Sequence, residues 1–138
     1  MLIPAVLIAN CVNPILTALL AAAPFVGIRK SSCWEFWGRS ALALGLAVVL
    51  AESGKDFQVW PGHPSFPSGH ETFGLCAVTN LALWDLRWLI LGLPLLSLLA
   101  WALVDAHFHQ PIDVVGALLV GPPCAVLLQW KRNPRKVR

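Results

Sequence analysis

Two short segments of the chain carry residue types that could bind an anion or carry out nucleophilic chemistry. The first is Pro67-Ser68-Gly69-His70, in which the proline fixes the approach of the chain, the serine can cap a helix and the glycine lets backbone come close to a ligand. The free N–H groups of such a first helical turn, helped by the helix dipole, form an anion site. The segment therefore predicts an anion site at the start of a helix.

The second segment is His109-Gln110-Pro111-Ile112-Asp113. His109 and Asp113 are four positions apart, so a helical turn would place both side chains on one face. The carboxylate of Asp113 would then hold the His109 ring in one tautomer and leave the other ring nitrogen free to attack. We therefore expect His109 to be a nucleophile that Asp113 orients.

The composition indicates that these segments belong to a membrane protein. Of the 138 residues, 57% are hydrophobic and 12% are charged, about half the charged share of a typical soluble domain. This length predicts one transmembrane domain over residues 1–130. The basic residues that follow predict a cytoplasmic tail over residues 131–138. The basic residues flank apolar segments and form no separate face, which argues against nucleic acid as a partner.

The apolar runs predict an all-α, polytopic bundle of about five transmembrane helices. A helix needs about 20 residues to cross a bilayer, and shorter apolar runs must include flanking aromatic residues. Pro122 and Pro123 predict a kink in the last helix. The five predicted spans are residues 2–28, 34–51, 70–84, 88–104 and 112–130.

The basic residues also orient the predicted bundle. Only Lys55, of the ten lysines and arginines, falls within the loops 52–70 and 105–111, so the positive-inside rule puts both loops outside the cytoplasm. Ionisable groups that gather at one membrane boundary are candidates for function. We expect an integral protein of a bacterial inner membrane, in contact with the lipid bilayer, with its site facing the periplasm or outside. All four histidines fall in or beside these loops: His63, His70, His107 and His109.

Together the two segments resemble the type-2 phosphatidic acid phosphatase superfamily, over about residues 55–121. The Pro-Ser-Gly-His sequence opens one membrane helix, and His109 with Asp113, followed by Val114-Val115-Gly116, opens a later one. The resemblance implies a metal-independent phosphohydrolase without a cofactor, acting on a membrane lipid phosphate or an isoprenoid (polyprenyl) phosphate or diphosphate. It implies that His109 attacks phosphorus to form a phosphohistidine, that His70 protonates the leaving oxygen and that Asp113 orients His109.

The resemblance also implies which residues bind the phosphate. Ser68 and Gly69 would contribute, and Lys55 matches the lysine of the family's first motif. Two arginines of the family pattern are replaced by Gly62 and Leu103. His63 stands about where the first is expected and, if protonated, would supply part of its charge.

The missing arginines leave two alternatives open. Arginine holds phosphate through a planar fork that histidine and leucine do not reproduce, and losing such a charge costs about a hundredfold or more in rate. One alternative is therefore a protein that binds an anionic lipid or phosphate without hydrolysing it. The other is a zinc site, with ligands drawn from the outer loops. Its candidate ligands are His107 and His109 with His63, His70 or Asp105. The oligomeric state stays open.

Overall fold

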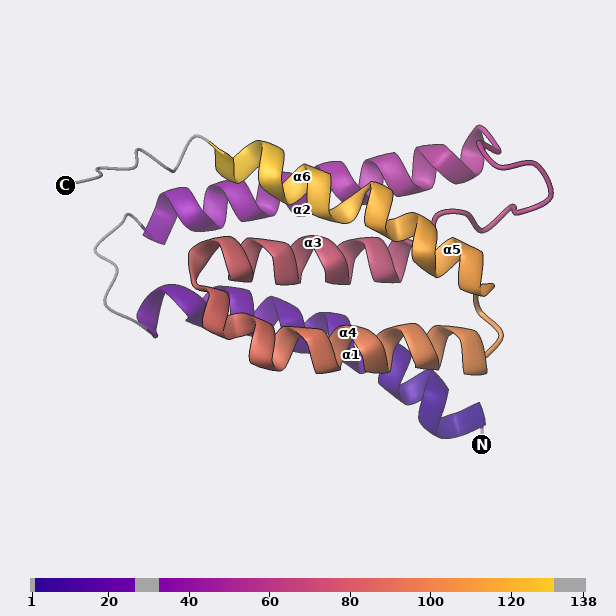
Figure 1. The fold of residues 1–138 in the computed structure, drawn as a ribbon, viewed down its shortest axis with the longest axis horizontal. Coiled ribbons are helices and arrows are strands. Elements are labelled where there is room, and N and C mark those ends of the chain that lie inside the picture. The colour runs from indigo at the N-terminus through magenta and orange to yellow at the C-terminus, as the bar shows by residue number, and fades with distance from the viewer. Residues whose placement is uncertain (1, 27–32, 131–138) are drawn as a thin grey trace.

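The regular structure in the described part of the chain is entirely helical. The computed structural model describes residues 2–26 and 33–130. Three short 3-10 segments, Ala23–Phe25, Leu86–Trp88 and Ala117–Leu119, join or extend the helices (Figure 1). The predicted all-α class is confirmed. The α-helices are α1 (Leu2–Ala22), α2 (Cys33–Asp56), α3 (Gly69–Trp84), α4 (Leu89–Asp105), α5 (Pro111–Gly116) and α6 (Gly121–Gln129).

Four helical segments among the described residues are long and apolar enough to cross a membrane, as expected of an integral membrane protein. The last of them contains both α5 and α6, and the 3-10 segment lies between these two helices. Pro122 and Pro123 follow in the first turn of α6, where a missing N–H group is tolerated. The predicted kink is therefore a break between two helices. The four segments are Pro4–Phe25, Cys33–Asp56, Leu86–Asp105 and Pro111–Gln129.

The predicted span over residues 70–84, which forms α3, is shorter than the four long segments and lies in the middle of the bundle. Its 16 residues extend about 24 Å, less than the hydrocarbon core of about 30 Å. The helix contacts α1, α2, α4 and α6, and Figure 1 shows it between them. Because protein surrounds α3, its polar side chains Thr72 and Asn80, both fully buried, face other helices.

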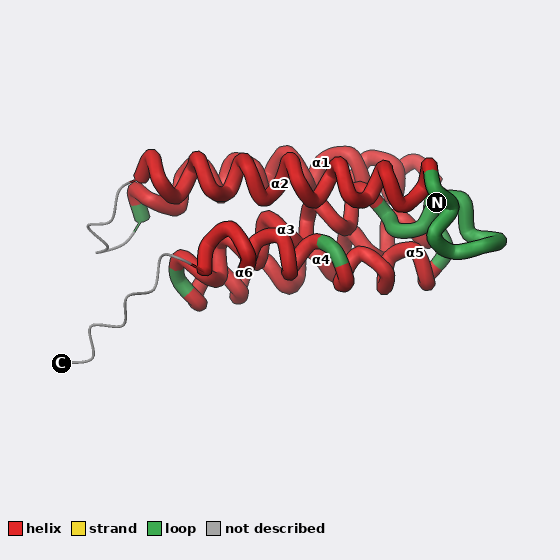
Figure 2. Tube along the Cα trace, turned by 90° about the horizontal axis from the view of Figure 1, so that it is seen from above, coloured by secondary structure: helices red, strands yellow, loops and turns green. Residues whose placement is uncertain are grey.

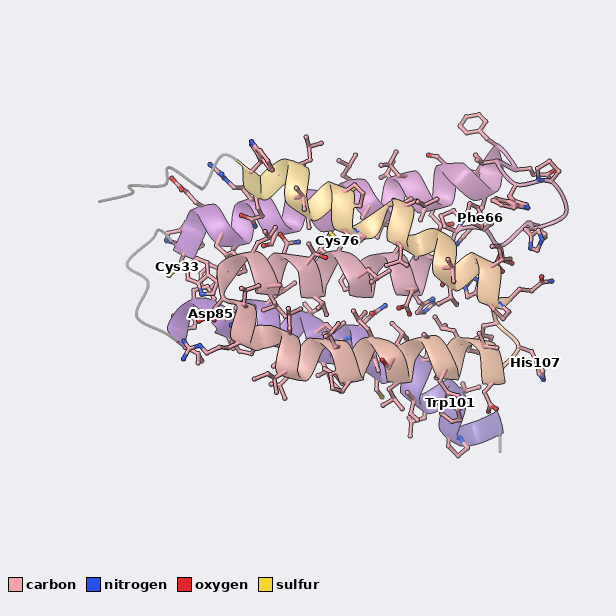
Figure 3. All side chains as sticks on the ribbon, viewed as in Figure 1. Cys33, Phe66, Cys76, Asp85, Trp101 and His107 are labelled. Carbon is pink, nitrogen blue, oxygen red and sulfur yellow. The ribbon has the colours of Figure 1, made fainter. Side chains whose placement is uncertain are left out.

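The loops that carry the histidines lie together at one end of the bundle. Residues 57–68 connect α2 to α3 and residues 106–110 connect α4 to α5, and both connections lie at the right of Figure 1. Figure 2 shows the same end from a second direction. In Figure 3, Phe66 and His107 lie near this end, whereas Asp85 of the α3–α4 turn lies near the opposite one. The predicted basic tail, residues 131–138, lies outside the described residues.

A set of uncharged polar side chains joins three helices in the opposite half of the bundle. We call Ser40 of α2, Asn80 of α3 and Gln129 of α6 the amide cluster; each is at most 5% exposed. The Gln129 Nε2 group donates to Asn80 Oδ1 at 2.9 Å and to Ser40 Oγ at 3.2 Å. Asn80 Nδ2 donates to the Cys76 carbonyl at 2.9 Å. These bonds hold α2, α3 and α6 together within one chain.

Candidate active site

The beginning of α5 fixes the position of Asp113. Pro111 is the first residue of the helix, and the Gln110 N–H before it donates to Asp113 Oδ2 at 2.9 Å. A carboxylate in the third helical position commonly reaches back to a free N–H group in this way. The Asp113 side chain is 3% exposed. Asp113 is therefore a buried carboxylate held by the first turn of α5.

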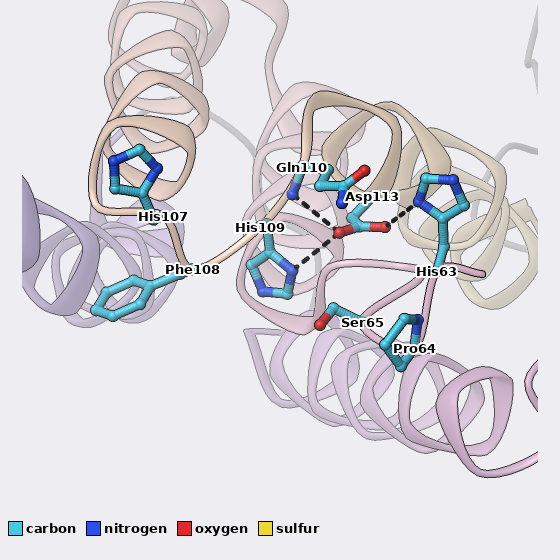
Figure 4. Close-up of a pocket in the computed structure, with 8 residues that line it drawn as sticks. All are labelled: His63, Pro64, Ser65, His107, Phe108, His109, Gln110 and Asp113. Atoms are coloured by element: carbon cyan, nitrogen blue, oxygen red, sulfur yellow. Dashed lines mark hydrogen bonds and ion pairs between the residues drawn. The ribbon is translucent and has the colours of Figure 1, made fainter.

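His109 meets Asp113 as predicted, but a helical turn is not the cause. His109 Nδ1 lies 3.7 Å from Asp113 Oδ2, although His109 precedes α5 and is not part of it. Its backbone N–H instead donates to the Leu103 carbonyl at 3.2 Å, at the end of α4. The predicted contact forms, but His109 is not part of the helix, because the chain folds back from α4 before Pro111 starts α5. Figure 4 shows that the Nδ1 edge of the ring faces the carboxylate.

The surroundings of His109 favour its neutral form. Burial lowers the pKa of His109 below the ordinary value, the carboxylate of Asp113 opposes this effect, and the positive charges of Lys55 and His70 lower the pKa further. The side chain is 10% exposed. A neutral imidazole keeps a lone pair, which a nucleophile requires. These effects also mean that Lys55 and His70 lie close enough to His109 to influence its pKa.

A second histidine faces the other oxygen of the same carboxylate. His63 Nδ1 lies 3.8 Å from Asp113 Oδ1 (Figure 4). We call His63, His109 and Asp113 the histidine cluster. The sequence predicted His63 as a ligand of the substrate and gave no sign of this contact, because the two residues are 50 positions apart and no periodicity links the loop to α5.

The first turn of α3 lies beside the histidine cluster. Ser68 caps the helix by accepting from the Glu71 N–H at 3.4 Å, and its own backbone N–H donates to the Asp113 carbonyl at 2.9 Å. Its side chain is fully buried. The predicted helix cap is therefore confirmed, and a backbone bond connects the beginnings of α3 and α5.

Gly69 brings Lys55 close to the same helical turn. A Cβ atom at Gly69 would lie 3.1 Å from Glu52 Oε1 and 3.4 Å from Lys55 Nζ, so a larger side chain would crowd this ion pair. The ammonium group of Lys55 is 2.7 Å from Glu52 Oε1. The next residue, His70, is exposed, and its carbonyl accepts from Asn13 Nδ2 at 3.1 Å. A cation therefore lies at the predicted phosphate site, already paired with a carboxylate.

A pocket of about 350 Å³ opens at the histidine cluster. Its walls come from the loop before α3 and the loop before α5, and it reaches His107 and Phe108 on the far side from His63 (Figure 4). Lys55, Ser68, Gly69 and His70 are not among its lining residues. The structure thus brings His63, His109 and Asp113 together at the pocket and leaves the other four predicted residues around it. The lining residues are His63, Pro64, Ser65, His107, Phe108, His109, Gln110 and Asp113.

Neither the metal alternative nor an arginine clamp finds support in this geometry. Within residues 2–26 and 33–130, no group of three or more His, Cys, Asp or Glu side chains is arranged to hold a metal ion. Leu103 is fully buried in α4, and Gly62 lies in an exposed turn with a φ of 83°. The positions of the two family arginines therefore carry no charge.

No protein-family model, curated protein or solved structure matches this chain. The resemblance to the type-2 phosphatidic acid phosphatase superfamily rests on the motif residues alone.

Proposed function

We propose that the protein is an integral membrane phosphohydrolase that removes phosphate from a lipid phosphate or a polyprenyl phosphate or diphosphate, without a metal. The observation that carries the proposal is the placement of His109. Its Nδ1 edge faces a buried carboxylate, and its pKa is lowered by burial. A neutral ring in this arrangement presents Nε2 as the nucleophile.

The proposed reaction has two displacements. In the first, Nε2 of His109 attacks phosphorus, the P–O bond to the leaving group breaks (an ester bond in a monophosphate, an anhydride bond in a diphosphate), and His70 gives its proton to the leaving oxygen. In the second, water attacks the phosphohistidine and the N–P bond breaks. His70 takes a proton from that water, and inorganic phosphate leaves. Lys55 and the N–H groups of the first turn of α3 would stabilise charge on the phosphoryl oxygens.

The proposed topology places this site where a lipid headgroup can reach it. We propose that α3 also spans the membrane, in addition to the four long segments. We further propose that the loops at residues 57–68 and 106–110 face the periplasm or outside. The distribution of basic residues supports this orientation. A lipid would keep its chains in the bilayer while its phosphate enters the pocket at the end of the helices.

A matched pair of histidine variants tests the mechanism. Purified protein in detergent should release phosphate from phosphatidic acid or a polyprenyl diphosphate in the presence of a chelator. His109→Asn should lower the rate by about a thousandfold or more, as nucleophile removals do. His107→Asn, which changes a neighbouring wall of the same pocket and tolerates the local backbone, should keep the rate. Equal rates for His109→Asn and wild type would disprove the mechanism.

A second candidate function, binding without hydrolysis, is favoured by one observation. Lys55 is already paired with Glu52, and Gly62 and Leu103 supply no charge. The site could then hold an anionic headgroup and lack the charge needed for transfer. Binding to anionic vesicles that depends on Lys55, together with no phosphate release and no acid-labile phosphoryl protein, would favour this candidate over the enzyme.

A further inference from the structure

We propose that His63 is a positioning residue, which holds the carboxylate of Asp113 so that the carboxylate orients His109. The inference deepens the proposed function and rests on it for its catalytic meaning. Its structural content, an approach of His63 Nδ1 to Asp113 Oδ1 that closes to a hydrogen bond, starts from the observed 3.8 Å separation and can be tested without a substrate.

Three buried atoms of the histidine cluster lack hydrogen-bond partners. His63 Nδ1, His109 Nδ1 and Asp113 Oδ1 are each buried without a hydrogen bond. Buried polar atoms nearly always have partners, and leaving one unsatisfied costs about 1–3 kcal/mol. His63 Nδ1 and Asp113 Oδ1, now 3.8 Å apart, satisfy each other if the gap closes by less than about 1 Å. His109 Nδ1, 3.7 Å from Asp113 Oδ2, gains a partner by a similar approach. Catalytic hydrogen bonds are often long in a free site and tighten when substrate binds.

The two oxygens of the Asp113 carboxylate face different groups. Oδ2 accepts from the Gln110 N–H and faces His109, whereas Oδ1 has His63 as its facing group. One hydrogen bond leaves a carboxylate free to rotate about its χ2 torsion, which has a broad energy profile. A second bond on the opposite oxygen fixes the plane of the group. His63 is therefore placed to keep Oδ2 directed at His109.

Backbone hydrogen bonds and one aromatic contact hold His63 within its loop. The His63 N–H donates to the Trp60 carbonyl and the His63 carbonyl accepts from the Phe66 N–H, both at 3.1 Å. The Trp60 ring lies edge-on to His63, with centroids 6.2 Å apart, and packs against Phe66 at 5.2 Å. Phe66 is 7% exposed and lies against Gly116 of α5, where any Cβ atom would overlap its ring. The loop is thus fastened to the helix that carries Asp113.

The tautomer that this role requires differs from the one that suits phosphate binding. To donate to Asp113, a neutral His63 must carry its proton on Nδ1, so that Nε2 presents a lone pair. A lone pair repels a phosphate oxygen. A neutral His63 therefore supports Asp113 and does not clamp the substrate, which corrects the simplest reading of this residue as a replacement for arginine.

Three substitutions at His63 separate the two roles. His63→Asn keeps an N–H donor close to the position of Nδ1, His63→Gln moves the donor farther from the backbone, and His63→Ala removes it. A positioning role predicts that only the asparagine variant retains turnover. We expect the alanine and glutamine variants to lose about 10- to 100-fold in kcat, the range seen when groups that orient a histidine are removed, with KM for the lipid phosphate unchanged.

A spectroscopic measurement keeps the test independent of activity. In ¹⁵N NMR spectra of the protein in detergent without substrate, His109 should carry its proton on Nδ1 in the wild type and in His63→Asn. In His63→Ala and His63→Gln it should shift toward the Nε2–H tautomer. In an Asp113→Asn background, His63→Ala should cause no further change in tautomer or in rate, because the two residues act through one contact.

Two results would overturn the inference. One is an unchanged His109 tautomer in both His63→Ala and His63→Gln; the other is a raised KM in His63→Asn equal to that in His63→Ala, which would make His63 a ligand of phosphate. Absence of phosphate release from wild-type protein would instead contradict the proposed function and leave the NMR result to decide the role of His63.

Discussion

The amide cluster and the histidine cluster are both buried sets of polar side chains, yet they differ in how far their hydrogen bonds are completed. In the amide cluster, bonds of 2.9 to 3.4 Å connect Ser40, Asn80 and Gln129, and Gln129 Oε1 is the buried side-chain atom left without a partner. The histidine cluster leaves three such atoms and borders a pocket. A nearly completed network of neutral groups stabilises the bundle, whereas unpartnered ionisable groups beside a pocket mark a candidate functional site.

Substitution of the shared carboxylate should give the largest effect. Asp113→Asn keeps the size of the side chain but places an amide where two imidazoles need an acceptor, so His109 can settle in the wrong tautomer. We expect kcat to fall by about 10²- to 10⁴-fold, by analogy with hydrolases in which this substitution leaves the fold intact. Stopped assays of phosphate release measure the change, and a thermal melt close to that of wild type would confirm that the fold is retained. A rate within twofold of wild type would remove the histidine cluster from the mechanism.

A substitution in the amide cluster should instead lower stability and leave the rate unchanged. Asn80→Leu keeps the branched shape of the side chain but removes the acceptor for Gln129 and the donor to the Cys76 carbonyl. We expect a loss of about 1–2 kcal/mol in stability, within the range for hydrogen bonds between membrane helices, with no change in rate per folded molecule. Unfolding in mixed micelles of increasing denaturant content gives the stability. A lost rate at unchanged stability would contradict the division between the two clusters.

The pH dependence of the rate should reveal the charges around His109. Attack requires the neutral ring, and the pKa of His109 lies below the ordinary histidine value of about 6.5. The decrease of kcat/KM on the acidic side (the acidic limb) should therefore be centred at a pH below this ordinary histidine value. Lys55→Gln removes a positive charge that disfavours protonation, so the pKa of His109 should rise and the limb should move to higher pH. A limb that stays in place, or that moves to lower pH, would show that Lys55 does not act on His109.

The smallest expected effect concerns His107, which lines the pocket but belongs to neither cluster. Its φ of 58° lies in the left-handed region at the end of α4, where glycine is favoured. His107→Gly should raise stability by up to about 1 kcal/mol and leave the rate unchanged. His107→Ala keeps the backbone cost and provides the control. A large loss of rate in His107→Gly would show that lining the pocket is enough for a catalytic role.

The sequence predicted those parts of the molecule that depend on composition and local order. Apolar runs located the helices because each must present lipid with an apolar surface, and the alternation of loops brought residues 57–68 and 106–110 to one end. The cap at Ser68 followed from residue type and position. The predicted span over residues 70–84 agrees with α3 to within one residue, and its short length and polar residues suit a central helix that other helices surround.

Contacts between distant residues could not be predicted in the same way. The approach of His63 to Asp113 depends on the path of an irregular loop and on the packing of Phe66 against Gly116, which no periodicity encodes. The His109–Asp113 contact was predicted from helical spacing and formed by a different geometry. The predicted positions of Lys55 and His70 near His109 agree with the electrostatic effects on its pKa, while the pocket itself lies on the side of His63 and His107.

The bond from the Ser68 N–H to the Asp113 carbonyl sets the conditions for transplanting this arrangement into another protein. It joins the first turns of α3 and α5 through backbone atoms, so most side-chain exchanges in the intervening 44 residues leave it unaffected. A designer would need two helix beginnings in this register and a short return loop. The exposed surface of α4 could then be redesigned without disturbing the bond between the two helix beginnings.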